Sequence, residues 1–91
     1  MPNYVLSSRA VRDLDEIAIY SREMWGEEQA RVYLAAIEQC CASLTANLKR
    51  ARQPLPRRPN LLSMRCQHHF IFFVNLETPL VVAIYHERMD K

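Results

Sequence analysis

Apolar residues recur every three or four positions in the first half of the chain, which is the period of an α-helix. The first stretch spans residues 8–24, with Ser7 as a natural N-cap, and a second covers roughly residues 27–48. The apolar positions of these stretches are Val11, Leu14, Ile17 or Ala18, and Met24, then Ala30, Tyr33 or Leu34, Ile37, Cys41, Leu44 and Leu48. Gly26, the only glycine, separates the stretches. We therefore expect a positive φ at Gly26 and two helices that fold back into an α-hairpin with a shared apolar seam.

The second half of the chain has the patterns of β-strands. A proline-rich loop, residues 49–60, with five basic and no acidic side chains, precedes three expected antiparallel strands at 61–66, 69–75 and 80–88. A short strand at residues 3–6 opens the chain. The order is β-α-α-β-β-β, which predicts an α+β two-layer domain with the α-hairpin packed on a mainly antiparallel sheet. At 91 residues we expect one domain, residues 1–91.

Two surfaces of this fold can be anticipated from alternation along the strands. The strand at 69–75 is apolar on both faces, so its second face needs a further cover or remains an exposed patch. In a regular strand at 80–88, His86 and Arg88 share one face with Val82 and Ile84, whereas Tyr85 and Glu87 lie opposite. These four polar residues cannot then converge on one substrate, and we expect His86 to cap the core edge with a hydrogen bond.

Three aromatic residues on the helices and three cysteines have structural interpretations. Tyr20, Trp25 and Tyr33 are expected to pack in the seam of the α-hairpin rather than to form a ligand site. Cys40 and Cys41 are adjacent on a helix and point to different faces, so they cannot bond to each other, and Cys66 is alone in a strand. We expect three reduced, mostly packed thiols.

Composition and charge narrow the class of protein. Hydrophobic residues make up 49% of the chain and charged residues 24%, which predicts a folded domain. Residues 1–48 carry four basic and seven acidic side chains, whereas residues 49–91 carry eight basic and three acidic ones. A basic sheet half indicates an acidic partner or phosphates. The apolar runs are too short for a membrane span and the N-terminus lacks a signal peptide pattern, so a cytoplasmic protein is expected.

Few residues offer chemistry. No glycine loop, HExxH, paired CxxC or GxSxG motif occurs in the sequence, and we expect neither a cofactor nor a metal site. One catalytic alternative remains open: ribonuclease chemistry that uses histidines as acid and base and arginines on the phosphate, from Arg65, His69, His86 and Arg88. The apolar run at 70–73 argues against an RNA surface there. The basic loop is interpreted as a connector or a docking site for an acidic protein, and no sequence-specific nucleic-acid binding is expected.

The sequence resembles the ParE toxins of the RelE/ParE toxin–antitoxin superfamily over nearly its whole length. Residues 4–38 are similar to the family's opening strand, its "LS…A…DL.EI..Y" helix and its "WG.EQA..Y" turn; residues 61–75 to its hairpin with an "H.IFY" strand; and "AIYHERMD" to its closing "V.H.RMD". The resemblance implies a toxin that is not a hydrolase, blocks DNA gyrase and is silenced by a ParD-like antitoxin. RelE-like relatives share the fold but cut mRNA on the ribosome. The "HERMD" ending and the absence of lysine between Lys49 and Lys91 favour the inhibitor over the endoribonuclease.

The resemblance also gives the apolar second face of the sheet a purpose. An antitoxin segment can cover that face with a helix in a groove and an added edge strand, and acidic antitoxin tails suit the basic sheet half. We expect the target- or antitoxin-binding residues to be Arg57, Arg58, Arg65, Phe70, Phe72 and Arg88.

Overall fold

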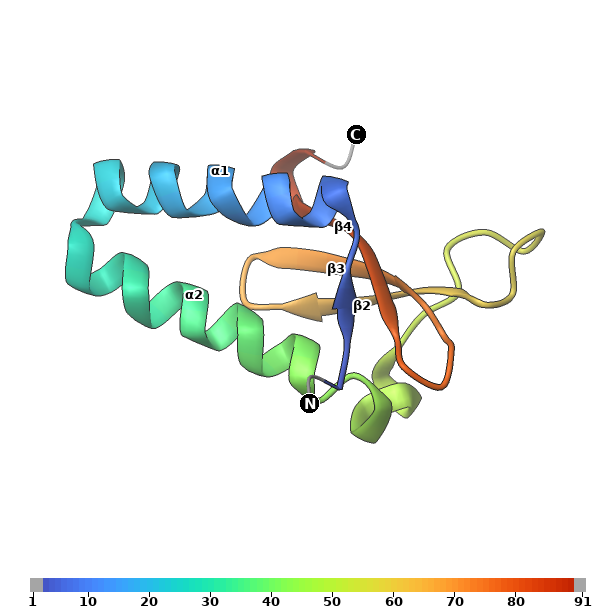
Figure 1. The fold of residues 1–91 in the computed structure, drawn as a ribbon. Helices are drawn as coiled ribbons and strands as arrows, with labels where there is room; N and C mark the ends of the chain where they lie inside the picture. The colour runs from blue at the N-terminus through green and yellow to red at the C-terminus, as the bar shows by residue number, and fades with distance from the viewer. Residues whose placement is uncertain (1–2, 90–91) are drawn as a thin grey trace.

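The computed structural model describes residues 3–89 and has the predicted order of elements. Its elements are β1 (Val5–Leu6), α1 (Ser8–Trp25), α2 (Glu27–Ala42), the 3₁₀ helix η1 (Thr45–Arg50), β2 (Leu61–Cys66), β3 (His69–Val74), β4 (Leu80–His86) and the 3₁₀ helix η2 (Glu87–Met89). Asp90, the last residue of the "HERMD" motif, lies outside the described residues. The α+β class is confirmed, with an α-hairpin lying along a four-stranded sheet (Figure 1).

The sheet has the strand order β1-β4-β3-β2. The β2–β3 and β3–β4 pairs are antiparallel, and the short β1 runs parallel to β4, so the sheet is mainly antiparallel as expected. Side chains of β3 alternate between buried and partly exposed. The helix-facing side carries His69, Ile71 and Phe73, and the outer side carries the residues between them.

The start of α1 closes the edge of β4 where β1 ends. Ser7 is the N-cap, as predicted: its Oγ accepts a hydrogen bond from the Ala10 amide at 3.0 Å and donates one to the Val82 carbonyl at 2.9 Å. Further along α1, Asp13 Oδ2 accepts a hydrogen bond from the Ile84 amide at 2.9 Å. Side chains of a helix thus satisfy backbone groups that an exposed edge strand would leave unpaired.

The α-hairpin turns at Gly26, whose backbone has φ 93° and ψ 169°. The positive φ is confirmed. Its amide donates to the Arg22 carbonyl and its carbonyl accepts from the Ala30 amide, both at 3.0 Å, so one residue ends α1 and begins α2.

The predicted apolar seam of α1 was partly wrong. Ala10, Ile17 and Ser21 are buried, whereas the predicted seam residues Val11 and Met24 are exposed. The spacing of large apolar residues predicted the wrong buried face of α1, because two of the three buried residues, Ala10 and Ser21, are small and carry little hydrophobic signal. The stripe of α2 was predicted better, since Ala30, Ile37, Cys41 and Leu44 are all buried.

The expected packing of aromatic residues in the seam was also wrong for two of three residues. Tyr20 and Trp25 are 54% and 49% exposed, and only Tyr33 is partly buried. The three rings instead form a line on the surface, with centroids 6.1 Å apart from Tyr20 to Trp25 and 5.7 Å from Trp25 to Tyr33.

The second helix ends earlier than predicted, at Ala42 rather than near residue 48. The Ser43 hydroxyl donates to the Gln39 and Cys40 carbonyls at 2.9 and 3.2 Å, which satisfies the end of α2, and η1 follows. Regular structure also extends into the basic segment expected to be all loop, because η1 includes residues 49 and 50 and Arg52 pairs with Ser63. Leu44 and Leu48 still pack on the core, so the predicted period located the packing but not the helix.

The last strand differs from prediction at both ends. A bulge opposite Phe72 and Phe73 shifts the register, so that Val81 pairs with Phe73. Val81 is therefore fully buried on the same face of the sheet as Ile84, whereas regular alternation placed the two residues on opposite faces. The strand then ends at His86, and Glu87 and Arg88 belong to η2. The alternation expected through Arg88 therefore stops two residues earlier.

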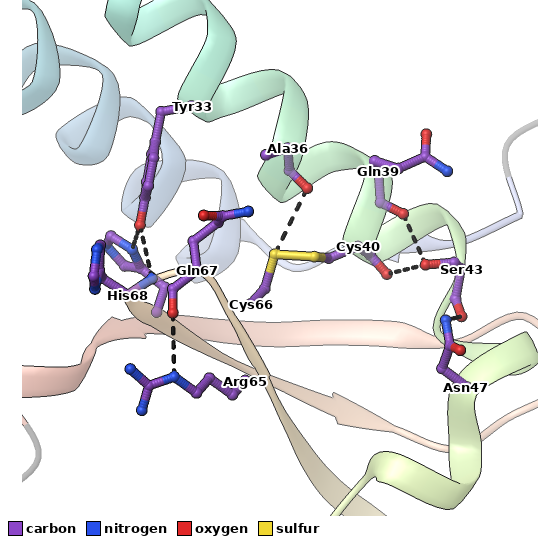
Figure 2. Close-up of a disulfide and its surroundings, with 11 residues drawn as sticks. Tyr33, Ala36, Gln39, Cys40, Ser43, Asn47, Arg65, Cys66, Gln67 and His68 are labelled. Carbon is purple, nitrogen blue, oxygen red and sulfur yellow. Dashed lines mark hydrogen bonds between the residues drawn. A yellow bond between two sulfur atoms is a disulfide. The ribbon is translucent and has the colours of Figure 1, made fainter.

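The expectation of three reduced thiols was wrong. Cys40 in α2 and Cys66 at the end of β2 form a disulfide (Figure 2). Among the described cysteines only Cys41 is free, and it is buried in the core. The pairing depends on how α2 packs against β2, which spacing in the sequence does not reveal.

Candidate functional site

The outer face of the sheet carries a half-buried aromatic surface flanked by arginines. The register places Arg65 of β2 beside Phe70 of β3 and Phe70 beside Tyr85 of β4, all facing away from the helices. The Phe72 and Tyr85 rings pack edge to face at 5.5 Å, and the Arg65 guanidinium lies 5.7 Å from the Phe70 centroid. We call this surface, made by Arg65, Phe70, Phe72 and Tyr85, the outer aromatic face.

Arg9 of α1 reaches the same surface from the β4 edge. Its guanidinium lies 4.9 Å from the centre of the Tyr85 ring, within the range of a cation–π contact. Two arginines from different layers therefore border the outer aromatic face. Neither Arg9 nor Tyr85 was predicted as a site residue. Strand alternation is the signal for Tyr85, but it needs the β3–β4 register to place that ring beside Phe70 and Phe72.

A cluster of charged side chains lies next to this face, at the β2–β3 turn. Arg65 forms an ion pair with Glu87, whose other carboxylate oxygen is 3.0 Å from His68 Nδ1. The hydrogen bond from His68 lowers the pKa of Glu87, and the nearby Arg65 charge lowers it further. The backbone joins the same groups, because the Glu87 amide donates to the His68 carbonyl at 2.9 Å. Glu87 thus ties η2 to the turn.

A second polar group lies on the helix-facing side of the same turn. The Tyr33 hydroxyl is 2.7 Å from His69 Nδ1 and accepts a hydrogen bond from the His68 amide at 3.2 Å. His69 is only 7% exposed, and burial lowers its pKa to about 4, with the neighbouring charges of His86 and His68 acting in the same direction and Glu87 opposing them. His69 is therefore neutral at neutral pH, and the Tyr33 hydroxyl donates to its Nδ1.

The four residues considered for ribonuclease chemistry are not aimed at one point. Arg65 lies on the outer face and is paired with Glu87, whereas His69 is buried on the opposite face and bonded to Tyr33. The rings of His69 and His86 do meet, at 5.0 Å between centroids, but His86 Nδ1 accepts from the Arg88 amide at 3.1 Å. Acid, base and cation therefore do not share an open cleft in this arrangement.

The structure places the predicted binding residues at two ends of the sheet. Arg65, Phe70 and Phe72 come together on the outer aromatic face, and the exposed Arg88 lies beyond β4 near the β2–β3 turn. Arg57 and Arg58 are exposed in the loop before β2, which projects from the opposite end of the sheet (Figure 1).

Within residues 3–89, no three histidine, cysteine or acidic side chains are gathered so that they could hold a metal ion. In the same range, no helix has the length and apolar character needed to cross a membrane. A shallow hollow beside the β2–β3 turn is lined by Trp25, Gln29, Tyr33, Gln67 and His68.

Comparisons with known proteins agree on one family. A family model described as the ParE toxin of the type II toxin–antitoxin system parDE matches residues 4–91. Toxin ParE of Escherichia coli is 41% identical over 92 residues, covering 99% of this chain and 89% of the relative. Toxin ParE1 of Mycobacterium tuberculosis is 32% identical over 89 residues, covering 96% and 91%. A solved structure, "Chromosomal ParDE TA system from P. aeruginosa", shares the fold with a TM-score of 0.73 at 18% identity, covering 94% of this chain and 98% of the other.

Proposed function

We propose that this chain, which belongs to the ParE toxin family of type II toxin–antitoxin systems, inhibits DNA gyrase in the cytoplasm and is silenced by a ParD-like antitoxin. The observation that carries the proposal is the outer aromatic face. Phe70, Phe72 and Tyr85 form a partly exposed apolar surface on the side of the sheet that the α-hairpin leaves open. Such a surface, bordered by charged residues, is typical of a protein-binding site.

The chemistry of this face suits an antitoxin segment with apolar anchors and acidic neighbours. The Phe72–Tyr85 pair offers an apolar contact. The Arg9 guanidinium lies over the Tyr85 ring, and the Arg65 guanidinium lies over the neighbouring Phe70 ring. Arg9 is 3.7 Å from Asp13 and Arg65 is paired with Glu87, and both arginine side chains are more than half exposed. A partner that buries the rings and adds carboxylates beside these arginines gains hydrophobic contact and charge complementarity together.

Inhibition by binding is also supported by what the polar residues do. Two of the four residues that ribonuclease chemistry would use are bonded to other residues: Arg65 to Glu87, and His69 to Tyr33. Arg88, by contrast, is exposed at the end of the sheet and has no side-chain hydrogen bond among the described residues. We propose Arg88 as a contact to gyrase or the antitoxin, with Arg57 and Arg58 as contacts at the opposite end of the sheet.

The test is a supercoiling assay with purified gyrase and plasmid DNA. The toxin is expected to inhibit supercoiling or to raise the amount of cleaved DNA. His86→Gln should retain this activity, because His86 serves a local backbone contact, whereas Arg88→Ala should weaken it with an unchanged melting temperature. Arg12→Ala, an exposed arginine of α1, is the matched control for loss of one positive charge.

The same preparations should be incubated with translating ribosomes and mRNA. Ribosome-dependent mRNA cleavage without any effect on gyrase would replace this proposal with the endoribonuclease alternative. In that case His86→Gln is expected to reduce cleavage by roughly a hundredfold, as loss of a general base does.

A further inference from the structure

The Cys40–Cys66 disulfide joins the two layers of the fold at one place. Cys40 lies in the last turn of α2, and Cys66 is the last residue of β2, immediately before the Gln67–His68 turn (Figure 2). The bond closes a loop with a sequence separation of 26 residues, which includes η1 and the basic loop. It therefore fixes the position of the β2–β3 hairpin relative to α2.

The two sulfur atoms differ in their surroundings. Cys40 is partly exposed on the side of α2, whereas Cys66 is 3% exposed. Attack by an external thiolate requires a path to one sulfur, and Cys40 is the cysteine of the pair that offers one. Cys66 is then the leaving group, which remains inside the protein.

A hydrogen-bond acceptor lies beside Cys66 and can bind its thiol when the disulfide is reduced. Cys66 Sγ lies 3.6 Å from the Ala36 carbonyl oxygen of α2 (Figure 2). A sulfur atom in a disulfide carries no proton, so this contact becomes a hydrogen bond only when the bond is reduced. The buried thiol then has an acceptor, and its burial leaves no unsatisfied polar group.

The third cysteine takes no part in exchange. Cys41 is 2% exposed and belongs to the hydrophobic core. Burial, with the nearby charge of Glu38, raises the pKa of the Cys41 thiol to about 11, so at neutral pH it is a thiol and not the attacking thiolate.

We propose that Cys40–Cys66 is a redox-reversible clasp that a dithiol reductant opens by attack on Cys40, and that opening it loosens the β2–β3 hairpin from α2. The reductant's thiolate bonds to Cys40 Sγ as the S–S bond breaks, and Cys66 leaves as a thiolate and takes up a proton. The second thiolate of the reductant then attacks its own sulfur in the mixed disulfide and releases Cys40, which is also protonated. Two electrons and two protons pass to the protein, and the reductant becomes a cyclic disulfide.

The expected consequence is local. After reduction, the links between α2 and the turn are the Tyr33 contacts to His69 and the His68 amide, with the new Cys66 hydrogen bond. The turn also carries the Arg65–Glu87–His68 cluster beside the outer aromatic face. The redox state therefore governs how firmly that end of the toxin is held, whichever target the toxin acts on.

The experiment equilibrates the folded protein in mixtures of reduced and oxidised dithiothreitol, followed by alkylation and intact-mass analysis. Alkylation in denaturant should count three thiols in the reduced protein and only Cys41 in the oxidised protein, whereas in the folded reduced protein the partly exposed Cys40 should react before the buried Cys66 and Cys41. Reduction should lower the melting temperature by roughly 10 °C or more, and oxidised dithiothreitol should restore it. Hydrogen exchange should rise over residues 61–74 while α1 stays protected.

Two variants complete the test. Cys40→Ser should reproduce the exchange pattern of the reduced protein and no longer respond to reductant, whereas Cys41→Ala should respond as the wild type does. A bond that dithiothreitol reduces only in denaturant overturns the proposal, as does a reduced protein with an unchanged melting temperature and exchange pattern. Three free thiols in the presence of oxidised dithiothreitol overturn it as well. These three outcomes are measured on the wild-type chain, so they decide the proposal even where a variant fails to fold.

Discussion

At the scale of single residues, two positions between residues 3 and 89 adopt positive φ, and they differ in which side chains they tolerate. Gly26 has φ 93° and ψ 169°, a region essentially restricted to glycine, and no heavy atom beyond its chain neighbours lies within 4 Å of where a Cβ would stand. Gln67, at φ 57°, has the φ of the left-handed helical region, which asparagine enters readily. Any cost of a side chain at Gly26 is thus backbone strain and not a steric clash.

We predict opposite outcomes for asparagine at these two positions. Gly26→Asn should lower the free energy of unfolding by about 1–3 kcal/mol, and Gly26→Val by at least as much, because both force a side chain into a glycine-only region. Gln67→Asn should raise stability slightly or leave it unchanged. Urea denaturation of the variants and the wild type measures this. Equal effects of asparagine at both positions would show that the two turns are not distinguished by backbone strain.

At the scale of secondary-structure elements, the sequence pattern predicted those features that depend on residues close together in the chain. Ser7 as N-cap, Gly26 as the helix junction and the three long strands follow from residues close in sequence, and all are present. The 72/73 bulge and the Cys40–Cys66 bond depend on how distant elements meet, and neither was foreseen. Candidate residues were therefore identified by type, while the place of Arg9 and Tyr85 beside Phe70 and Phe72 needed the structure.

The contact between α2 and β3 predicts a dependence of stability on pH. The pKa of His69 is about 4 in the fold and near 6.5 when the chain is unfolded, so between these values the unfolded state binds the extra proton. Stability from this group is complete above pH 6.5 and falls as the pH drops toward 4, by at most about 3 kcal/mol. Below that range no further loss arises from His69. Glu87, whose pKa is lowered mainly by the hydrogen bond from His68, adds its own loss as the pH falls below the group's ordinary pKa of 4.5.

Tyr33→Phe tests this account. Removing the hydroxyl that donates to His69 should lower the free energy of unfolding at pH 7 by about 1 kcal/mol. It should also reduce the loss between pH 6.5 and 4, because the neutral form of His69 is less favoured. His68→Gln removes only one of the smaller contributions to the lowered pKa of His69 and leaves its burial unchanged, so it should retain most of that loss. A flat stability profile from pH 7 to 4.5 in the wild type would contradict the assignment of a neutral, buried His69.

At the scale of the whole molecule, the sheet is covered unequally on its two faces. The α-hairpin and the core lie on one side, with Ile71, Phe73 and Val81 almost fully buried. The outer face holds Phe70, Phe72 and Tyr85, which are only partly buried in the described chain. A small domain gains little stability from such rings until a partner removes them from water, which couples stability of the toxin to antitoxin binding.

This asymmetry predicts that one substitution on the outer face separates antitoxin binding from folding. Phe72→Arg replaces an aromatic anchor with a charge at the centre of the proposed contact, so antitoxin affinity should fall at least about tenfold, equivalent to about 1.4 kcal/mol. Leu76→Arg is the matched control, since it adds the same charge at an exposed position between β3 and β4. Co-purification with the antitoxin and calorimetric titration should show the loss for Phe72→Arg alone, with melting temperatures of both free variants close to the wild type.

Because an unsilenced toxin harms its host, cells that co-express antitoxin should tolerate Leu76→Arg but not Phe72→Arg. If both variants bind as the wild type does, the antitoxin covers another surface, and the outer aromatic face must be assigned to a different partner.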